Sequence, residues 1–311
     1  MSNDELLKSN PEKYMPDQSG KVFVITGGTN GLGAQSAIVL AKHNAARIYI
    51  TGRNSDAAEA VVQKIKRTGS KTVVTFLHAD LTDLESVRAA ADKVLSETQR
   101  VDVLMANAGV MCLGMGLTKQ GYEQQFGINH MGNALFIRKL MPALQRTAAQ
   151  AHDARVIILT SLAWTQAPKG GILFDGLKTE QDMFLGKFIR YAQSKLANIL
   201  YAKELAVRYP DVKSVSVHPG LVTTGLLNGL PAGYRFVMTR AGKKIPPEEG
   251  AWTQLWCCGA TDIKNGGFYE CPPVAELSKQ TSQYTEDKEL MSRLYEWTES
   301  ELSPYLNSTI V

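Results

Sequence analysis

Tyr191 and Lys195 are four residues apart in the segment YAQSK. On a helix this spacing places both side chains on one face, one turn apart. A tyrosine with the reference pKa of about 10 exchanges protons poorly near neutral pH, but a neighbouring ammonium lowers that pKa by favouring the phenolate. The pair could therefore pass a proton to or from a reacting oxygen atom. The same spacing also arises by chance, so the rest of the chain must support it.

A glycine-rich segment, TGGTNGLG at 26–33, follows the first apolar run. Glycine permits positive φ and close approach of backbone amides to an anion, and the helix that follows offers unpaired N–H groups. Gly27 is expected to close the turn, Gly31 to permit the approach and Gly33 to let helix and strand pack. A turn without a ligand is the alternative, but this position in the chain favours a dinucleotide. The expected contacts here are Gly27, Thr29, Asn30, Gly31, Leu32 and Gly33.

The second predicted strand ends in Gly52-Arg53-Asn54, with no acidic residue. A domain that prefers NAD usually carries a carboxylate about 20 residues after the glycines, where it binds the ribose 2′-hydroxyl. A guanidinium can instead pair bidentately with a 2′-phosphate, and Gly52 removes the repulsion that a carboxylate would bring. A solvated surface arginine is the alternative. We expect Arg53 and Asn54 to contact NADP(H).

The composition is that of an ordinary globular protein. The chain has 311 residues, of which 44% are apolar and 21% are charged. These values exclude a disordered chain, a collagen-like repeat and a disulfide scaffold. The net charge is +4, from 34 basic and 30 acidic side chains. Because the basic excess is scattered, we expect no nucleic-acid partner.

The four cysteines form no CxxC pair and have no histidines at zinc spacing. This pattern predicts reduced thiols and no bound metal. No stretch approaches the roughly 18 consecutive apolar residues that suggest a membrane span. Residues 1–18 are polar and lack the apolar core of a signal peptide. We therefore expect a cytoplasmic protein without a membrane span.

Short β-branched runs alternate with alanine-rich helical stretches from residue 21 onward. This alternation predicts an α/β fold, a Rossmann-like doubly wound parallel sheet with helices on both faces. The glycine- and proline-rich stretch at 221–247 predicts a variable substrate-binding lobe or lid. We expect an N-terminal arm at 1–19, one catalytic domain at 20–275 and a helical tail at 276–311. Strands are expected at 22–26, 47–51, 72–78, 101–106, 155–160, 212–218 and 266–270, and helices at 33–44, 55–68, 84–98, 121–150, 190–208 and 248–259.

Over about residues 20–275 the chain resembles a short-chain dehydrogenase/reductase of the compact type. Seven motifs occur in that family's order, and together they form a highly specific signal. They are TGxxxGxG at 26–33, HADL at 78–81, ANAG at 106–109, INH at 128–130, TS at 160–161, YxxSK at 191–195 and PG at 219–220.

The resemblance implies a role for each matching residue. Tyr191 would be the general acid–base, and Ser161 would hydrogen-bond the substrate oxygen. Lys195 would bind the nicotinamide ribose and lower the Tyr191 pKa. Asn129 would hold a water that links Lys195 to bulk solvent, although it could mainly bend its helix. Asp80 would bind the adenine amino group. The remaining cofactor contacts would be Leu81, Asn107, Ala108, Gly109, Tyr191, Pro219, Gly220, Val222 and Thr224.

Two features depart from the commonest family pattern. Ala106 replaces a second Asn, and 30 positions separate Ser161 from Tyr191, about twice the interval in many members. The longer interval is similar to the retinol dehydrogenase and WW-domain oxidoreductase branch. Its aromatic and methionine side chains predict an apolar pocket wall, and the lid at 221–247 would close over it. The wall residues are Trp164, Phe174, Met183, Phe184 and Phe188, and the lid residues are Leu226, Leu227, Leu230, Tyr234, Phe236 and Met238.

The expected function is NADPH-dependent reduction of a ketone or aldehyde in a bulky, largely apolar small molecule, with Tyr191 as the proton donor. One alternative is NADP-dependent oxidation of a retinoid-, steroid- or polyketide-type alcohol in a specialised pathway. Another is a non-catalytic NADP(H)-binding regulator, against which the intact catalytic residues argue. Family analogy further implies a homodimer or homotetramer paired through the helices at 121–150 and 190–208.

Overall fold

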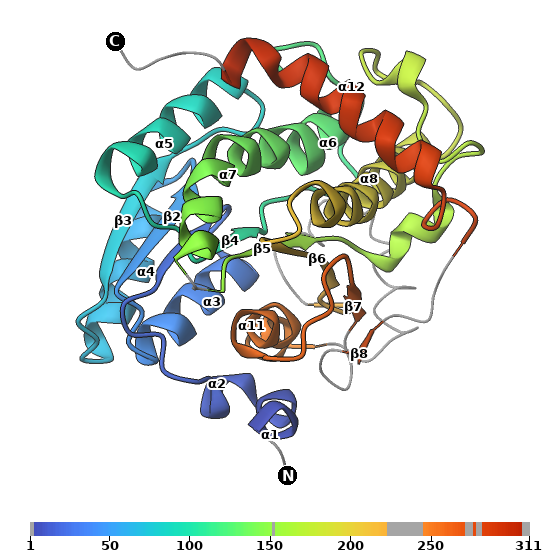
Figure 1. Ribbon diagram of the computed structural model, residues 1–311. Coiled ribbons are helices and arrows are strands. Elements are labelled where there is room, and N and C mark those ends of the chain that lie inside the picture. Colours follow the sequence, from blue (N-terminus) through green and yellow to red (C-terminus); the bar gives the residue numbers. More distant parts are fainter. Residues whose placement is uncertain (1–2, 151–152, 223–244, 271–275, 278–281, 307–311) are drawn as a thin grey trace.

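The computed structural model describes residues 3–150, 153–222, 245–270, 276–277 and 282–306. Within these residues, an eight-stranded sheet has the order β3-β2-β1-β4-β5-β6-β7-β8. β8 pairs antiparallel with β7, and all the other pairs are parallel. The predicted α/β fold is therefore confirmed (Figure 1). The strands are β1 (Val22–Ile25), β2 (Arg47–Gly52), β3 (Val73–His78), β4 (Val103–Ala106), β5 (Arg155–Leu159), β6 (Lys213–His218), β7 (Phe268–Glu270) and β8 (Glu276–Leu277).

Alternate residues of the strands supply two hydrophobic cores. Val22 and Val24 of β1 belong to the core on one face, whereas Phe23 and Ile25 belong to the core on the other. Because both faces are covered, the central strands are continuous apolar runs. Helices α5, α7, α8 and α12 contribute to the first core, and α3, α4 and α11 to the second. The helices are α3 (Gly31–Lys42), α4 (Ser55–Arg67), α5 (Leu84–Glu97), α7 (Asn133–Ala149), α8 (Gly186–Arg208), α10 (Pro247–Gly250), α11 (Trp252–Gly259) and α12 (Lys288–Leu306).

The direction of the strand order changes at β1, which lies between β2 and β4. At such a switch point a crevice forms beyond the carboxyl ends of the strands, and open α/β sheets bind their ligands there. The predicted glycine turn leads directly from β1 into α3. The Asn30 side chain caps that helix by accepting a hydrogen bond from the Gly31 amide at 2.7 Å.

The single helix predicted at 121–150 is divided in the structure. A short α6 (Gln124–Phe126) leads into the π-helical segment η1 (Gly127–Gly132), and α7 follows. A π-helical turn redirects the side chains that it carries and often occurs at a functional site. Asn129 lies within η1. Its side chain therefore does not follow the direction that an uninterrupted α-helix would give it.

The N-terminal arm contains two short helices, α1 (Asn3–Ser9) and α2 (Pro11–Tyr14), which contact α11. Leu7 and Met15 are buried in the second core. The polar composition of this segment predicts an arm that precedes the fold. Pro11, however, occupies the first position of α2, where a missing N–H group costs nothing.

The C-terminal tail forms α12, which packs against α7 and α8 of its own chain (Figure 1). His130 Nε2 lies 2.9 Å from Thr298 Oγ1. The Trp297 ring meets Phe126 and Phe174 edge-on, with ring centroids 5.9 and 6.3 Å away. The homodimer or homotetramer stays a prediction, and α12 covers part of the helical surface through which it was expected to form.

No helix in the described part of the chain is long and apolar enough to cross a membrane. Most of the predicted lid, residues 223–244, falls outside the described residues, and Cys271 does as well. The six lid side chains named above all belong to that segment.

Replacing Trp297 with alanine should lower the free energy of unfolding by about 2–3 kcal/mol, because removing a large packed side chain leaves a cavity. Urea-induced unfolding followed by circular dichroism measures this change. Glu296→Ala, at an exposed neighbouring position of α12, is the matched control and should change the free energy by about 0.5 kcal/mol or less. Equal small effects would contradict the packing of α12 on the body of the domain.

Candidate active site

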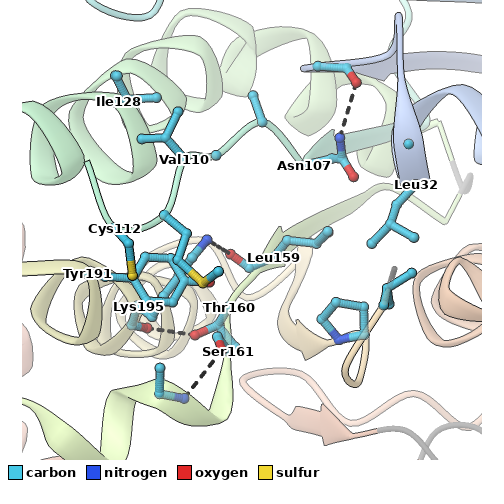
Figure 2. A pocket seen from close by; sticks show the side chains of 18 of the residues that line it. Leu32, Asn107, Val110, Cys112, Ile128, Leu159, Thr160, Ser161, Tyr191 and Lys195 are labelled. Carbon is cyan, nitrogen blue, oxygen red and sulfur yellow. Dashed lines mark hydrogen bonds between the residues drawn. The ribbon is translucent and has the colours of Figure 1, made fainter. Parts of the chain in front are cut away.

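A cavity of about 1220 Å³ opens beyond the carboxyl ends of the strands. It extends from the glycine turn to Tyr191 and Ser161 (Figure 2). A site for one small ligand usually has roughly 300–1,000 Å³, so this cavity offers room for a dinucleotide and a substrate together. The predicted site residues that line it are Gly27, Thr29, Asn30, Gly31, Leu32, Arg53, Asp80, Leu81, Asn107, Ala108, Gly109, Ser161, Tyr191, Lys195, Pro219, Gly220 and Val222.

The hydroxyl of Thr26, at the end of β1, joins three segments beside the cavity. Its Oγ1 accepts hydrogen bonds from the amides of Asn107 and Ala108, each at 3.0 Å. It also donates to Asn133 Oδ1 at 2.7 Å. Thr26 is completely buried, so water cannot replace these partners. The hydroxyl thus fixes the glycine turn relative to the end of β4 and the start of α7.

The glycines of the turn are required by geometry. Gly27 has a φ of +64°, which glycine adopts without the steric penalty of other residues. A Cβ on Gly33 would lie 2.5 Å from the Gly27 carbonyl oxygen, closer than real Cβ contacts allow. Gly33 does not line the cavity itself. It permits the close packing of α3 that brings Gly31 and Leu32 to the cavity wall.

Arg53 lines the end of the cavity next to β2 and is exposed. Among the described residues no carboxylate forms an ion pair with its guanidinium. A Cβ on Gly52 would lie 2.6 Å from Thr29 Oγ1, so any larger residue there would displace Thr29. Asn54 does not line the cavity. Its side chain caps α4 by accepting a hydrogen bond from the Ala57 amide at 2.9 Å.

Asp80 and Leu81 follow β3 and form another part of the wall. Asp80 Oδ1 accepts hydrogen bonds from the amide and the hydroxyl of Thr82, at 2.9 and 2.8 Å. Leu81 is buried against Gly132, where a Cβ would lie 2.9 Å from the leucine side chain. The local turn therefore fixes the direction of the Asp80 carboxylate at the cavity wall.

Tyr191, Lys195 and Ser161 converge at the other end of the cavity (Figure 2). Lys195 Nζ lies 5.7 Å from the centroid of the Tyr191 ring and donates a hydrogen bond to the Leu159 carbonyl oxygen at 3.1 Å. Ser161 begins the 3-10 helix η2 (Leu162–Gln166), where its Oγ accepts a hydrogen bond from the Ala163 amide at 3.2 Å. The structure thus places together three side chains that the sequence separates by up to 34 positions.

Burial determines the charge states of Tyr191 and Lys195. It raises the pKa of Tyr191 to about 12, although a hydrogen bond with Ser161 acts in the opposite direction. Burial lowers the pKa of Lys195 to about 8. The net pKa of Tyr191 is therefore raised, because desolvation of the phenolate outweighs the hydrogen bond with Ser161. The lowering of this pKa by Lys195 stays a prediction. At neutral pH Tyr191 holds its proton and Lys195 is mainly charged.

Asn129 lies behind the cavity wall and does not line it. Its Oδ1 accepts a hydrogen bond from the Val110 amide at 2.7 Å, and its Nδ2 donates to the Val110 carbonyl at 3.0 Å and to Ser194 Oγ at 2.9 Å. A Cβ on Gly109 would lie 3.2 Å from Asn129 Oδ1 and 3.3 Å from Lys195 Nζ. The side chain thus holds the wall beside Lys195. The water-holding role stays a prediction.

Four of the five residues predicted for the apolar wall do not line the cavity, so that prediction is wrong for them. Trp164 is buried in the core, Phe174 packs against Trp297 of α12, and Met183 and Phe184 lie away from the lining. Phe188 lines the cavity as predicted. The reason is that part of the insertion between Ser161 and Tyr191 packs against α12 and leaves the cavity. Thr224 falls outside the described residues.

The segment that directly follows the ANAG motif forms a wall of the cavity that was not predicted. Met111, Cys112 and Leu113 line the cavity, and Cys112 packs with Met111, Phe188 and Leu221 in a small apolar cluster. Cys112 has a φ of +56°, which is unusual for a residue other than glycine. This segment follows β4 at the same sheet edge as the ANAG motif, and that position could have predicted its place in the cavity wall.

His218, at the end of β6, also lines the cavity and was not predicted. Its Nδ1 is buried and has no hydrogen-bond partner among the described residues. Burial, assisted by the charge of Lys195, lowers its pKa to about 4. His218 is therefore neutral at physiological pH. No group of three His, Cys, Asp or Glu side chains in the described ranges is placed to hold a metal ion.

Comparison with known proteins agrees with this geometry. Residues 21–234 match the family model described as short chain dehydrogenase. The chain is 35% identical to a short-chain dehydrogenase/reductase of Aspergillus calidoustus, over 93% of this chain and 95% of that one. It is 33% identical to retinol dehydrogenase 11 of Mus musculus, over 81% and 78%. An uncharacterized protein of Mycobacterium paratuberculosis has the same fold, with a TM-score of 0.74, 24% identity and coverage of 94% and 97%.

Replacing Lys195 with methionine should stabilise the protein at pH 7. The pKa of Lys195 is about 8 in the fold against 10.5 for the free side chain, so the unfolded chain binds more protons between these values. The cost of burying the ammonium is fully present below pH 8 and disappears towards pH 10.5. The variant should therefore gain up to about 3 kcal/mol at pH 7 and less at pH 9.5. Urea-induced unfolding at both pH values measures the difference.

Lys66→Met, on the exposed side of α4, is the matched control and should change stability little at either pH. A Lys195→Met protein less stable than the parent at pH 7 would show that the ammonium is not buried at a cost.

Proposed function

Because the chain belongs to the short-chain dehydrogenase/reductase family, whose enzymes act on CH–OH and C=O groups, we propose that it reduces the carbonyl of a bulky, largely apolar small molecule with NADPH. The observation that carries the proposal is the buried Tyr191 hydroxyl at the end of the cavity, beside Ser161 and Lys195. A phenol with a pKa of about 12 is a proton donor at neutral pH. It is therefore suited to protonating an oxygen atom that gains negative charge.

The other residues at this end of the cavity support the same chemistry. Ser161 can donate a hydrogen bond to the carbonyl oxygen and so hold it near the Tyr191 hydroxyl. The Lys195 ammonium stabilises negative charge on that oxygen in a site of low dielectric constant, where such interactions are strong. Met111, Cys112, Leu162, Phe188 and Leu221 line the cavity nearby. These largely apolar side chains favour an apolar substrate and exclude water.

The lining fits a nicotinamide dinucleotide. A Cβ at Gly33 would prevent α3 from packing against the glycine turn. The amides at the start of α3 provide a site for an anion. Asp80 and Leu81 would hold the adenine end, and Lys195 would hold the nicotinamide ribose. When bound, the nicotinamide supplies the hydride. Arg53, without an ion-pair partner among the described residues, favours NADP(H) over NAD(H) because a guanidinium pairs with a 2′-phosphate.

Tyr191→Phe should abolish reduction and leave cofactor binding intact. We expect NADPH consumption with decanal, acetophenone or menadione to fall by at least about 100-fold, because the proton donor is lost. NADPH binding, followed by nucleotide fluorescence, should not change. Tyr201→Phe is the matched control on the same helix, since the buried Tyr201 hydroxyl has no hydrogen-bond partner among the described residues. It should keep the parent rate.

Full activity of Tyr191→Phe would contradict the role assigned to the phenol. Tight NADPH binding by the parent without turnover of any of the three carbonyl compounds would count against the proposed substrate class. Failure of the parent to bind either nucleotide would overturn the assignment of the cavity.

Arg53→Ala should weaken NADPH binding by roughly 10- to 100-fold, the effect of removing a hydrogen-bonded charged partner. NADH binding should change little, because NADH has no 2′-phosphate. Dissociation constants from nucleotide fluorescence measure both. Arg67→Ala, at the exposed far end of α4, controls for the loss of one positive charge. Equal losses for the two nucleotides in Arg53→Ala would rule out the 2′-phosphate contact.

A further inference from the structure

Arg190 and Glu123 form an ion pair that is almost completely enclosed. The Arg190 Nε and Glu123 Oε1 atoms are 3.1 Å apart, and the side chains are 3% and 0% exposed. Removing two charges from water is costly, and a well-packed apolar pair often stabilises a protein as well or better. A buried pair of this kind is therefore a candidate for a positioning role.

The Arg190 guanidinium connects two further segments by hydrogen bonds to their backbone. Nη2 donates to the Leu113 carbonyl at 3.2 Å, and Nη1 donates to the Gln181 carbonyl at 3.1 Å. Leu113 belongs to the cavity wall after β4, and Gln181 belongs to the insertion between Ser161 and Tyr191. Arg190 immediately precedes Tyr191 on α8. One side chain thus connects the cavity wall and the insertion to the helix that carries the proton donor.

Glu123 fixes the other side of the pair. Its carboxylate accepts hydrogen bonds from the amides of Gln125 at 3.1 Å and Phe126 at 2.7 Å, which caps α6. Its own amide donates to the Leu177 carbonyl of the insertion at 2.8 Å. The segment that follows α6 is η1, which carries Asn129. The ion pair therefore anchors the guanidinium to the start of α6.

The cavity wall is held at both of its ends. Asn129 binds the amide and the carbonyl of Val110, and Arg190 binds the carbonyl of Leu113. Between these two points Cys112 has the strained φ of +56°, and its side chain lies close to Tyr191 (Figure 2). A non-glycine residue keeps such a conformation only where its surroundings hold it. If one attachment is removed, the wall can relax.

We propose that Arg190 is a positioning residue, whose guanidinium, anchored by Glu123, holds the wall at 110–113 against Tyr191 and so sets the orientation of the substrate carbonyl. The inference about the substrate rests on the proposed function. The inference about the wall does not, because it concerns only contacts within this chain. The cofactor turn is fixed separately by Thr26, so the loss of Arg190 should affect the substrate end of the cavity alone.

Alkylation of Cys112 by N-ethylmaleimide tests the wall without any turnover. The Cys112 side chain is buried, and burial raises its pKa to about 11, so it reacts slowly while the wall is in place. In a Cys271→Ser background, Arg190→Lys and the uncharged pair Glu123→Gln/Arg190→Met should label Cys112 at least about tenfold faster, because local opening exposes the thiol. Mass spectrometry identifies the labelled site.

Two controls separate a local effect from a general loss of stability. Cys257 and Cys258 are both 0% exposed in the second core, so they become labelled only when the domain unfolds. Arg138→Met/Glu299→Gln removes a second ion pair, which is partly buried and lies between α7 and α12. This double variant should leave the rate of Cys112 alkylation unchanged. An unchanged Cys112 rate in the Arg190 variants, or equal acceleration at all three cysteines, would overturn the proposal. If a variant does not fold, Glu123→Gln alone is tested under the same criteria.

Steady-state kinetics give the second readout. With a carbonyl compound that the parent reduces, Arg190→Lys should raise KM or lower kcat by at least about tenfold, because small displacements at a reacting centre are costly. The dissociation constant for NADPH should stay within about twofold, since phosphate binding depends on other segments. No turnover by the parent would count against the proposed function while the labelling result still decides the role of Arg190.

Discussion

The hydrogen bonds made by the Thr26 hydroxyl are the interaction on which the site most depends. They hold the end of β1 against Asn107 and Ala108 at the end of β4 and against Asn133 at the start of α7. In an open α/β sheet these strand ends border the crevice where ligands bind. The glycine turn, the segment after β4 and the helix that follows Asn129 therefore have fixed relative positions before any ligand enters. Removal of this one buried oxygen atom would take away the partner of the Ala108 amide and of Asn133 Oδ1, whereas the Asn107 amide would keep its hydrogen bond to the Met105 carbonyl at 3.0 Å.

The second constraint is electrostatic. Tyr191 and Lys195 are both buried, and burial disfavours the charged form of each group. The phenol therefore keeps its proton at neutral pH, while the ammonium keeps most of its charge only at the expense of stability. Such a site is destabilising for the folded chain and useful for chemistry, a combination that is common where residues must react. The apolar lining around Cys112 and Phe188 strengthens these effects by excluding water.

Most of the architecture could be predicted from the sequence, because continuous apolar strands and alanine-rich helices each have a distinct periodicity. The glycine turn and the spacing of Tyr191 and Lys195 could also be predicted, because local backbone and helix geometry explains why these residue types occur at these positions. The interruption of the helix at η1 could not be read, because Gly127–Gly132 does not break the apolar pattern. The contact of Phe174 with Trp297 of α12 depends on a tail more than 100 residues away. The pairing of Glu123 with Arg190 is a tertiary contact that no local pattern reveals.

Isotopic labelling of the cofactor follows the transferred hydrogen and so tests hydride transfer at this site. The purified parent protein is incubated with decanal and NADPH deuterated at C4 of the nicotinamide, on each face separately, and the alcohol is analysed by mass spectrometry and NMR. We expect one deuterium on the carbinol carbon from one of the two labelled faces, and none at the oxygen, whose proton comes through Tyr191 from solvent. An alcohol product without deuterium from either face would contradict reduction by hydride transfer at this site.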